Sequence, residues 1–368
     1  MLAYVVRRLL LIIPTLFGIM VINFIVIQFA PGGPIEQIIS ELTNPDMTAT
    51  SRITNAAAGE VQTDVSGAMG SSGTSRYRGA EGLDDEFIAK LEKQFGFDKP
   101  LWERFFLMIG NYLKFDFGTS FFSDKTVVEM VLSRMPVSIS LGLCTTIIVY
   151  LFSIPMGVGK AVWDGTRFDV WTSAIVIIGN AIPAFMFAVM LIVFFAGGSY
   201  FDWFPLQGLV SENHGEMSFF EQLLDRAHHL VLPVFAMVIG GFAALTFLTK
   251  NSFIDQINQQ YVLTARAKGL KERRVLFGHV FRNSMLIVIA GFPGAFVAIL
   301  FTGSLLIEII FNLEGLGLLG FEAVIDRDYP VMFATLYFFT LLGLVMNLIG
   351  DLTYTFVDPR IDFESRAT

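Results

Sequence analysis

Two glycine-rich segments resemble nucleotide-binding motifs. MGVGKA (residues 156–161) approaches the phosphate loop G-x-x-x-x-G-K-[ST], whose backbone N–H groups cradle phosphates, but Ile154 and Ala161 replace the first glycine and the final hydroxyl residue. GLGLLG (residues 315–320) matches the dinucleotide fingerprint by letter, yet it follows an apolar run rather than a predicted strand. We therefore expect neither an ATP site nor any cofactor in this chain. GLGLLG should instead form a tight turn or a re-entrant cap.

Hydrolytic and metal-binding signatures are also missing from the sequence. Neither H-E-x-x-H nor G-x-S-x-G occurs. His214, His228 and His229 lie close together in the sequence, and they could hold a metal ion or could be histidines at a membrane interface. We predict no catalytic residues and no metal site, so an intramembrane enzyme is disfavoured.

The composition is that of a membrane-embedded chain. Of the 368 residues, 54% are hydrophobic and only 16% are charged, whereas a soluble domain has about 25% charged residues. Mean hydropathy is +0.63. The single cysteine, Cys144, excludes a disulfide within the chain, and the net charge of −8 argues against nucleic acid as a partner.

Long uncharged stretches predict an all-α polytopic membrane protein with six transmembrane helices. Each stretch reaches the ~20 residues that a helix needs to cross ~30 Å of hydrocarbon, where only helices or closed barrels satisfy the backbone. The stretches are 9–35, 136–159, 170–201, 227–249, 283–307 and 329–350.

The first stretch is longer than the hydrophobic region of a signal peptide, which has about 7–15 residues. Ala30 is followed by Pro31, a poor cleavage context, so we expect a retained first span.

The distribution of Lys and Arg predicts the orientation of the spans. Positive residues concentrate at both termini, between the second and third spans, and above all at 250–283 between the fourth and fifth spans. The positive-inside rule makes this set cytoplasmic. Residues 31–135 would then lie outside, leaving 1–30 as the first span, 136–352 as the membrane core and 353–368 as a cytoplasmic tail.

The outside segment has an uneven composition. Residues 44–82 are small and polar, which predicts a flexible loop. Residues 83–114 predict short helices, with apolar residues at helical spacing from Leu83 and a second helix starting near Pro100, followed by turns. These helices could dock a partner, or they could simply pack over the membrane core.

The cytoplasmic segment 260–283, QYVLTARAKGLKERRVLFGHVFRN, predicts a short helix, a turn at Gly269 and a second helix. Small residues at Ala265, Ala267 and Gly269 would let another protein approach closely, and a short helix laid in a groove is a common recognition mode. A loop that only fixes topology and touches anionic lipid would explain the charges but not the small residues. The predicted contact residues are Tyr261, Val262, Leu263, Thr264, Ala265, Arg266, Ala267, Lys268, Gly269 and Leu270.

Polar residues within the apolar stretches are candidates for lining a pathway. For any single residue a hydrogen bond that joins helices is favoured, but as a group they suggest a route for something polar. Glu308 could meet a positively charged substrate or merely mark the interface. The candidates are Asn23, Gln28, Asn180, Thr302, Ser304, Glu308, Asn347 and Asp351.

TARAKGL followed by HVFRN resembles the cytoplasmic loop of dipeptide and oligopeptide permeases, the membrane subunits of bacterial ABC importers. In that superfamily the loop reads E-A-A-x-x-x-G, and here Leu263, Thr264 and Ala265 stand at the first three places and Gly269 at the last. The first two places depart from the general pattern, as is usual in the peptide branch. Further similarities span the chain: YVVRRLLLIIPTLFG, APGGP, FGFDKPLWERFF, KFDFGTSF, RMPVSISLGL and VDPR.

Details of the insert and tail, among them SRYRGAEGLD and DLTYTFVDPRIDFE, resemble the Yej-type subunit, linked to uptake of peptides and of microcin C. The resemblance implies the type I ABC importer permease fold in the inner membrane, with residues 31–135 in the periplasm. It implies a heterodimer with a second permease subunit, a cytoplasmic ATPase that binds ATP and Mg²⁺, and a periplasmic peptide-binding protein. The loop would be the coupling helix.

A secondary transporter or channel for a polar solute is the main alternative. It would also place polar residues in its spans, but it needs no groove-filling cytoplasmic helix, and ion coupling would call for more intramembrane charge.

Overall fold

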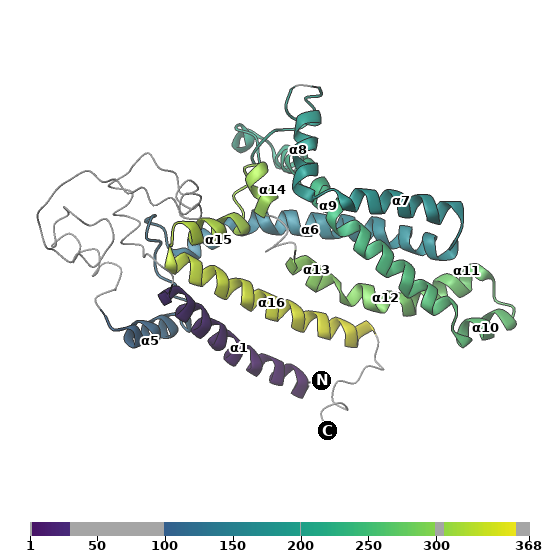
Figure 1. The fold of residues 1–368 in the computed structure, drawn as a ribbon, viewed down its shortest axis with the longest axis horizontal. Coiled ribbons are helices and arrows are strands. Elements are labelled where there is room, and N and C mark those ends of the chain that lie inside the picture. The colour runs from purple at the N-terminus through teal and green to yellow at the C-terminus, as the bar shows by residue number, and fades with distance from the viewer. Residues whose placement is uncertain (1, 30–98, 199, 299–304, 358–368) are drawn as a thin grey trace, which may run out of the picture. The chain divides into compact units, whose positions relative to one another are not determined.

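The computed structural model describes residues 2–29, 99–198, 200–298 and 305–357, and the regular elements within these ranges are helices (Figure 1). The predicted flexible loop, the helix expected from Leu83 and residues 358–368 of the predicted tail lie outside the described residues, whereas residues 353–357 belong to the last helix. The elements are α1 (Leu2–Phe29), α5 (Leu101–Tyr112), α6 (Val127–Val162), α7 (Arg167–Ala181), α8 (Ala184–Phe195), η1 (His214–Glu216), α9 (Phe219–Ile257), α10 (Gln260–Ala267), α11 (Glu272–Val275), η2 (Leu276–Val280), α12 (Phe281–Ala290), α13 (Phe292–Ala298), α14 (Leu305–Ile310), α15 (Leu316–Ile325) and α16 (Tyr329–Val357).

Five helical segments among the described residues are long and apolar enough to cross a membrane, and a bent pair makes a sixth. The spans are Tyr4–Ile22, Val127–Val162, Phe219–Ile257, Glu272–Val297 and Tyr329–Thr353. The all-α, six-span prediction is therefore confirmed in its main features. Helices α9 and α12 include residues of the basic region that lie beyond the predicted spans 227–249 and 283–307. A helix need not end at the boundary of the hydrocarbon.

The third predicted span, 170–201, is not one straight helix. Helices α7 and α8 meet at an angle of 91°, with Ile182 and Pro183 between them. Ile182 takes the extended conformation, with ψ of 120°, that a residue before proline prefers. We expected a proline kink to be tolerated here, but the structure shows a break.

The chain forms two compact units. The first comprises Met1–Ile12, Arg134–Leu318 and Phe339–Thr368, and the second comprises Ile13–Ser133 and Leu319–Phe338. In the first unit α9 is the central element, because α7, α8 and α12 all pack against it. Its contact with α6 is close: a Cβ added at Gly157 would stand 2.6 Å from the Thr249 Cβ and 2.7 Å from the Thr246 carbonyl oxygen.

The second unit contains α5, which starts one residue after Pro100, close to the prediction. Phe105, Ile109 and Tyr112 of this helix turn inward, whereas Leu101 is exposed. The turns after α5 are held by Asp328, whose carboxylate accepts hydrogen bonds from the Ser120 hydroxyl and, at 3.3 Å, from the Phe121 N–H. Burial raises the pKa of Asp328, while these hydrogen bonds oppose the shift.

Candidate functional site

Helix α10 follows α9 after a two-residue break, and it ends in a Schellman motif. Gly269 has φ of +77°, the left-handed conformation that glycine adopts without a steric penalty. Its N–H donates to the Arg266 carbonyl at 2.9 Å, and the Leu270 N–H donates to the Ala265 carbonyl at 3.3 Å. No atom lies within 4 Å of a Cβ added at Gly269. The need for glycine here is therefore conformational, and the sequence placed the turn correctly.

One face of α10 belongs to the protein core. Val262 is fully buried and Ala265 is 7% exposed, and both join the cluster that contains Phe253 of α9 and Val280 of η2. Leu270 packs against the same cluster. This apolar contact fixes α10 to the helices on either side of it in the chain.

The opposite face of α10 is open. Leu263 is 60% exposed, and Thr264, Ala267 and Lys268 are exposed beside it. The Thr264 hydroxyl donates to the Gln260 carbonyl at 3.0 Å, so it needs no outside partner. We call Leu263, Thr264, Ala267 and Lys268 the α10 face. It combines an apolar centre, small neighbours and one positive charge, which suits insertion into a groove.

A salt bridge ties α10 to α11. The Arg266 guanidinium donates to both carboxylate oxygens of Glu272, with distances of 2.5 and 3.1 Å. Hydrogen bonding to Glu272 raises the pKa of Arg266. Both side chains are exposed, so this pair adds little stability by itself. Its effect is to orient the two short helices across the Gly269 turn.

The predicted contact residues fall into two groups, one exposed and one turned toward the core. Thr264, Arg266, Ala267, Lys268 and Gly269 are exposed, whereas Val262 and Ala265 face the core and Tyr261 and Leu270 are half-buried against it. Tyr261 also donates to the Gln256 side chain at 3.0 Å. The sequence pattern predicted the short helix and its turn, but it did not separate the two faces of the helix. Leu263 is the apolar side chain that remains free for a partner.

The candidate pathway residues are only partly visible. Thr302 and Ser304 lie outside the described residues, as do the side chains of Asn23 and Gln28. Asn180 is exposed near the end of α7, and Glu308 is fully buried in α14. Asn347 and Asp351 of α16 line one cavity together with Arg8, whose guanidinium lies 2.8 Å from Asp351 Oδ2, and Asn180 and Glu308 are not among its lining residues.

Glu308 is bonded to two other segments of the first unit. Its Oε1 accepts from the Ser138 hydroxyl of α6 at 3.2 Å, and its Oε2 accepts from the Leu318 N–H at 2.7 Å. The Ser138 oxygen in turn accepts from the Leu316 N–H at 2.7 Å. The first N–H groups of a helix attract negative charge, so the start of α15 stabilises this carboxylate. A Cβ at Gly315 would overlap the carboxylate.

GLGLLG is therefore a helix start rather than a nucleotide loop. It packs against a buried acid, and its glycine at 315 leaves room for that acid. This contact agrees with the predicted cap, although most of the motif is helical. The geometry favours a structural role for Glu308 over contact with a substrate.

Two of the candidate histidines, His214 and His229, hold the loop before α9 to that helix. His214 Nδ1 lies 2.7 Å from Asp225 Oδ2, and His229 Nε2 lies 3.1 Å from the Ser211 hydroxyl, which donates to Asp225 at 2.5 Å. Within the described part of the chain, no group of three His, Cys, Asp or Glu residues is placed to hold a metal ion.

Comparison with known proteins places these features in a family. Residues 153–363, which include α10 and the Gly269 turn, match the family described as binding-protein-dependent transport system inner membrane component. The chain belongs to this family. Its members are permease subunits, and the several apolar helices described above fit a multi-pass membrane location.

Full-length relatives strengthen the assignment to these inner membrane components. The chain is 58% identical over 99% of both chains to the peptidoglycan transport system permease protein YejB of Agrobacterium fabrum. It is 56% identical, over 99% of this chain and all of the relative, to the inner membrane ABC transporter permease protein YejB of Escherichia coli O157:H7. It is 34% identical, again over 99% and 100%, to the oligopeptide transport system permease protein AppB of Bacillus subtilis.

The Schellman turn predicts the effect of replacing Gly269. Gly269→Ala should destabilise the end of α10 by about 1–2 kcal/mol, because a side chain is strained in the left-handed region. Amide hydrogen exchange at Leu270 should quicken in the purified protein. Gly278→Ala is the control, since its nearest neighbour would be the Arg274 Cγ at 3.9 Å. Equal exchange in both variants would contradict the conformational explanation.

The Glu308 contacts predict a loss of stability. Glu308→Ala removes the acceptor for the Ser138 hydroxyl and the Leu318 N–H, which should cost about 1–3 kcal/mol and lower the thermal unfolding temperature in detergent. Glu308→Gln keeps one acceptor oxygen and should cost less. A Glu308→Gln variant with unchanged thermal stability but altered transport of cationic substrates would instead support contact with a substrate.

Proposed function

We propose that this chain is a transmembrane permease subunit of an ATP-driven ABC importer, which moves peptides from the periplasm to the cytoplasm by alternating access. The family and the full-length relatives support the permease role. The relatives' names refer to peptidoglycan and oligopeptide transport, which supports peptides as the substrate class. Peptide conjugates such as microcin C belong to the same proposal.

The observation that carries the proposal is the two-sided construction of α10. Leu263 is 60% exposed, whereas its neighbours Val262 and Ala265 are anchored in the core. A partner that receives Leu263 in a groove would gain the free energy of burying it. Movement of that partner would then displace α9 and α12 together with α10. We infer that the α10 face is the contact with a cytoplasmic ATPase.

The location of ATP chemistry follows from the same elements. In MGVGKA, the segment most like a phosphate loop, all residues lie within α6, and the Lys160 side chain is 0% exposed. A phosphate-binding lysine must reach the ligand, which Lys160 does not. We propose that ATP and Mg²⁺ bind the partner ATPase and that this chain supplies no catalytic group.

Further partners complete the proposal. A second, related permease subunit would form the other half of the pathway, and a periplasmic peptide-binding protein would deliver the substrate. Exposed Trp102 and Phe106 on α5 offer apolar surface for that delivery. The charge distribution puts α10 and both termini in the cytoplasm.

A single substitution on the α10 face tests the function. Leu263→Asp should abolish ATP-dependent uptake of a labelled oligopeptide by native membrane vesicles, and the ATPase should no longer co-purify. Losing a central apolar anchor typically costs about 2 kcal/mol or more, which is roughly thirtyfold in affinity. Because Leu263 is exposed, the variant should insert normally.

Leu206→Asp is the matched control, because Leu206 is also exposed but lies on the outer connection. It should leave uptake and co-purification unchanged. Leu263→Asp with normal uptake and a bound ATPase would contradict the coupling role. Wild-type protein that moves peptide without ATP or any ATPase would instead support a secondary transporter or channel.

A further inference from the structure

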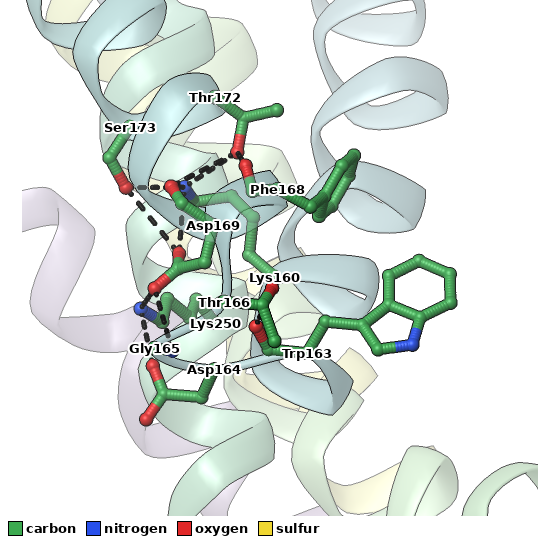
Figure 2. A network of polar contacts seen from close by, with 10 residues as sticks. All are labelled: Lys160, Trp163, Asp164, Gly165, Thr166, Phe168, Asp169, Thr172, Ser173 and Lys250. Atoms are coloured by element: carbon green, nitrogen blue, oxygen red, sulfur yellow. Dashed lines mark hydrogen bonds and ion pairs between the residues drawn. The ribbon is translucent and has the colours of Figure 1, made fainter.

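Asp169, near the start of α7, is the centre of a buried charge network (Figure 2). Its Oδ1 lies 3.0 Å from Lys160 Nζ of α6, and its Oδ2 lies 2.8 Å from Lys250 Nζ of α9. Its carboxylate also accepts the Gly165 N–H at 3.3 Å. One carboxylate thus bridges three helices and the turn between two of them.

The two lysines differ in their surroundings. Lys160 is fully buried, and its ammonium group also donates to the Asp169 carbonyl, the Thr172 hydroxyl and the Ser173 hydroxyl, at 3.0, 3.1 and 2.5 Å. Lys250 is partly exposed and makes a second ion pair with Asp164, at 2.7 Å. Lys160 therefore holds the α6–α7 turn together from within, and Lys250 fastens that turn to α9.

The attachment point on α9 is also where α9 meets its other neighbours. Thr249 lies against Gly157 of α6, and the Ser252 hydroxyl donates to the Ser284 carbonyl of α12 at 2.7 Å. Phe253, one turn further on, is fully buried in the cluster that anchors α10. Lys250 thus lies on the last two turns of α9, which end at Ile257, two residues before α10 begins.

The network adds a restraint on sliding to that of apolar packing. Apolar contacts in a membrane bundle gain no hydrophobic driving force against lipid and depend on close packing instead. Separating Lys250 from Asp169 would leave a charge poorly solvated at a buried site, which is strongly unfavourable. The α6–α7 turn should therefore move together with α9.

We propose that Asp169 and Lys250 are positioning residues for energy coupling, locking the α6–α7 turn to α9 so that displacement of α10 reaches α6, α7 and α9 as one body. This inference rests on the proposed importer function. It assigns a role to a cluster that touches neither ATP nor peptide. It also gives the lysine of MGVGKA a use other than phosphate binding.

Paired substitutions at Lys250 test the role in the assembled transporter. Lys250→Met keeps the length of the side chain but removes its charge, whereas Lys250→Arg keeps the charge and can still pair with Asp164 and Asp169. The readout is peptide taken up per ATP hydrolysed, measured in reconstituted complexes with the binding protein present. Lys250→Met should lower this ratio by about 5- to 150-fold, the usual range of coupling between sites. Lys250→Arg should restore most of it.

Asp169→Asn should reproduce the loss, and Arg167→Gln, an exposed residue at the start of α7, should not. An unchanged ratio in assembled Lys250→Met and Asp169→Asn complexes overturns the inference. So does a lower protein yield with a normal ratio, which would indicate stability alone. If Lys250→Met does not assemble, the assembled Asp169→Asn complex tests the same pair from its other partner, and a normal ratio in that complex overturns the inference.

The wild-type control keeps this test separate from the proposed function. A wild-type complex in which the partner ATPase hydrolyses ATP and peptide is imported establishes the function, whatever the variants do. Wild-type protein that assembles with no ATPase would refute the function itself.

Discussion

The pairing of Asp169 with Lys160 and Lys250 is the constraint on which the end of the first unit next to α10 depends. Charges at poorly solvated sites persist only when they are paired and hydrogen-bonded. This condition determines the geometry of the α6–α7 turn, because Asp164 and Asp169 must both reach Lys250 and the Gly165 N–H must reach Asp169. It also sets where α9 passes that turn, since Lys250 lies 2.8 Å from Asp169. The position of α10 then follows from α9 through Phe253 and the cluster around it.

The same requirement governs the cluster around Glu308. There the carboxylate accepts hydrogen bonds from Ser138 and from the start of α15. The two clusters differ in what they join. The Asp169 network joins α6, α7 and α9 through ion pairs. Glu308 joins the start of α15 to α6 through hydrogen bonds. Both replace water with fixed protein partners, which makes each junction stiff and leaves movement to the apolar contacts between them.

Much of this organisation could be predicted from the sequence. Hydropathy located the spans, and small residues around Gly269 located α10 and its turn. The 91° break at Ile182 and Pro183 could not be predicted, because hydropathy continues across it and prolines elsewhere, such as Pro233 in α9, are accommodated within a helix. The inward placement of Ala265 depends on tertiary packing. The Asp169–Lys250 pair joins residues 81 positions apart, and no local pattern connects them.

The most direct test of the central claim is a distance measurement within the assembled transporter. Spin labels at Arg167 and Lys271, both exposed, would report the separation of the α6–α7 turn from the α10–α11 segment, after Cys144→Ser removes the single native cysteine. The account predicts the same distance without nucleotide and with a non-hydrolysable ATP analogue, while the distance from Lys271 to a label on a second permease subunit changes. A change of about 5 Å, one helical turn, between Arg167 and Lys271 would show that the two segments move independently and would contradict it.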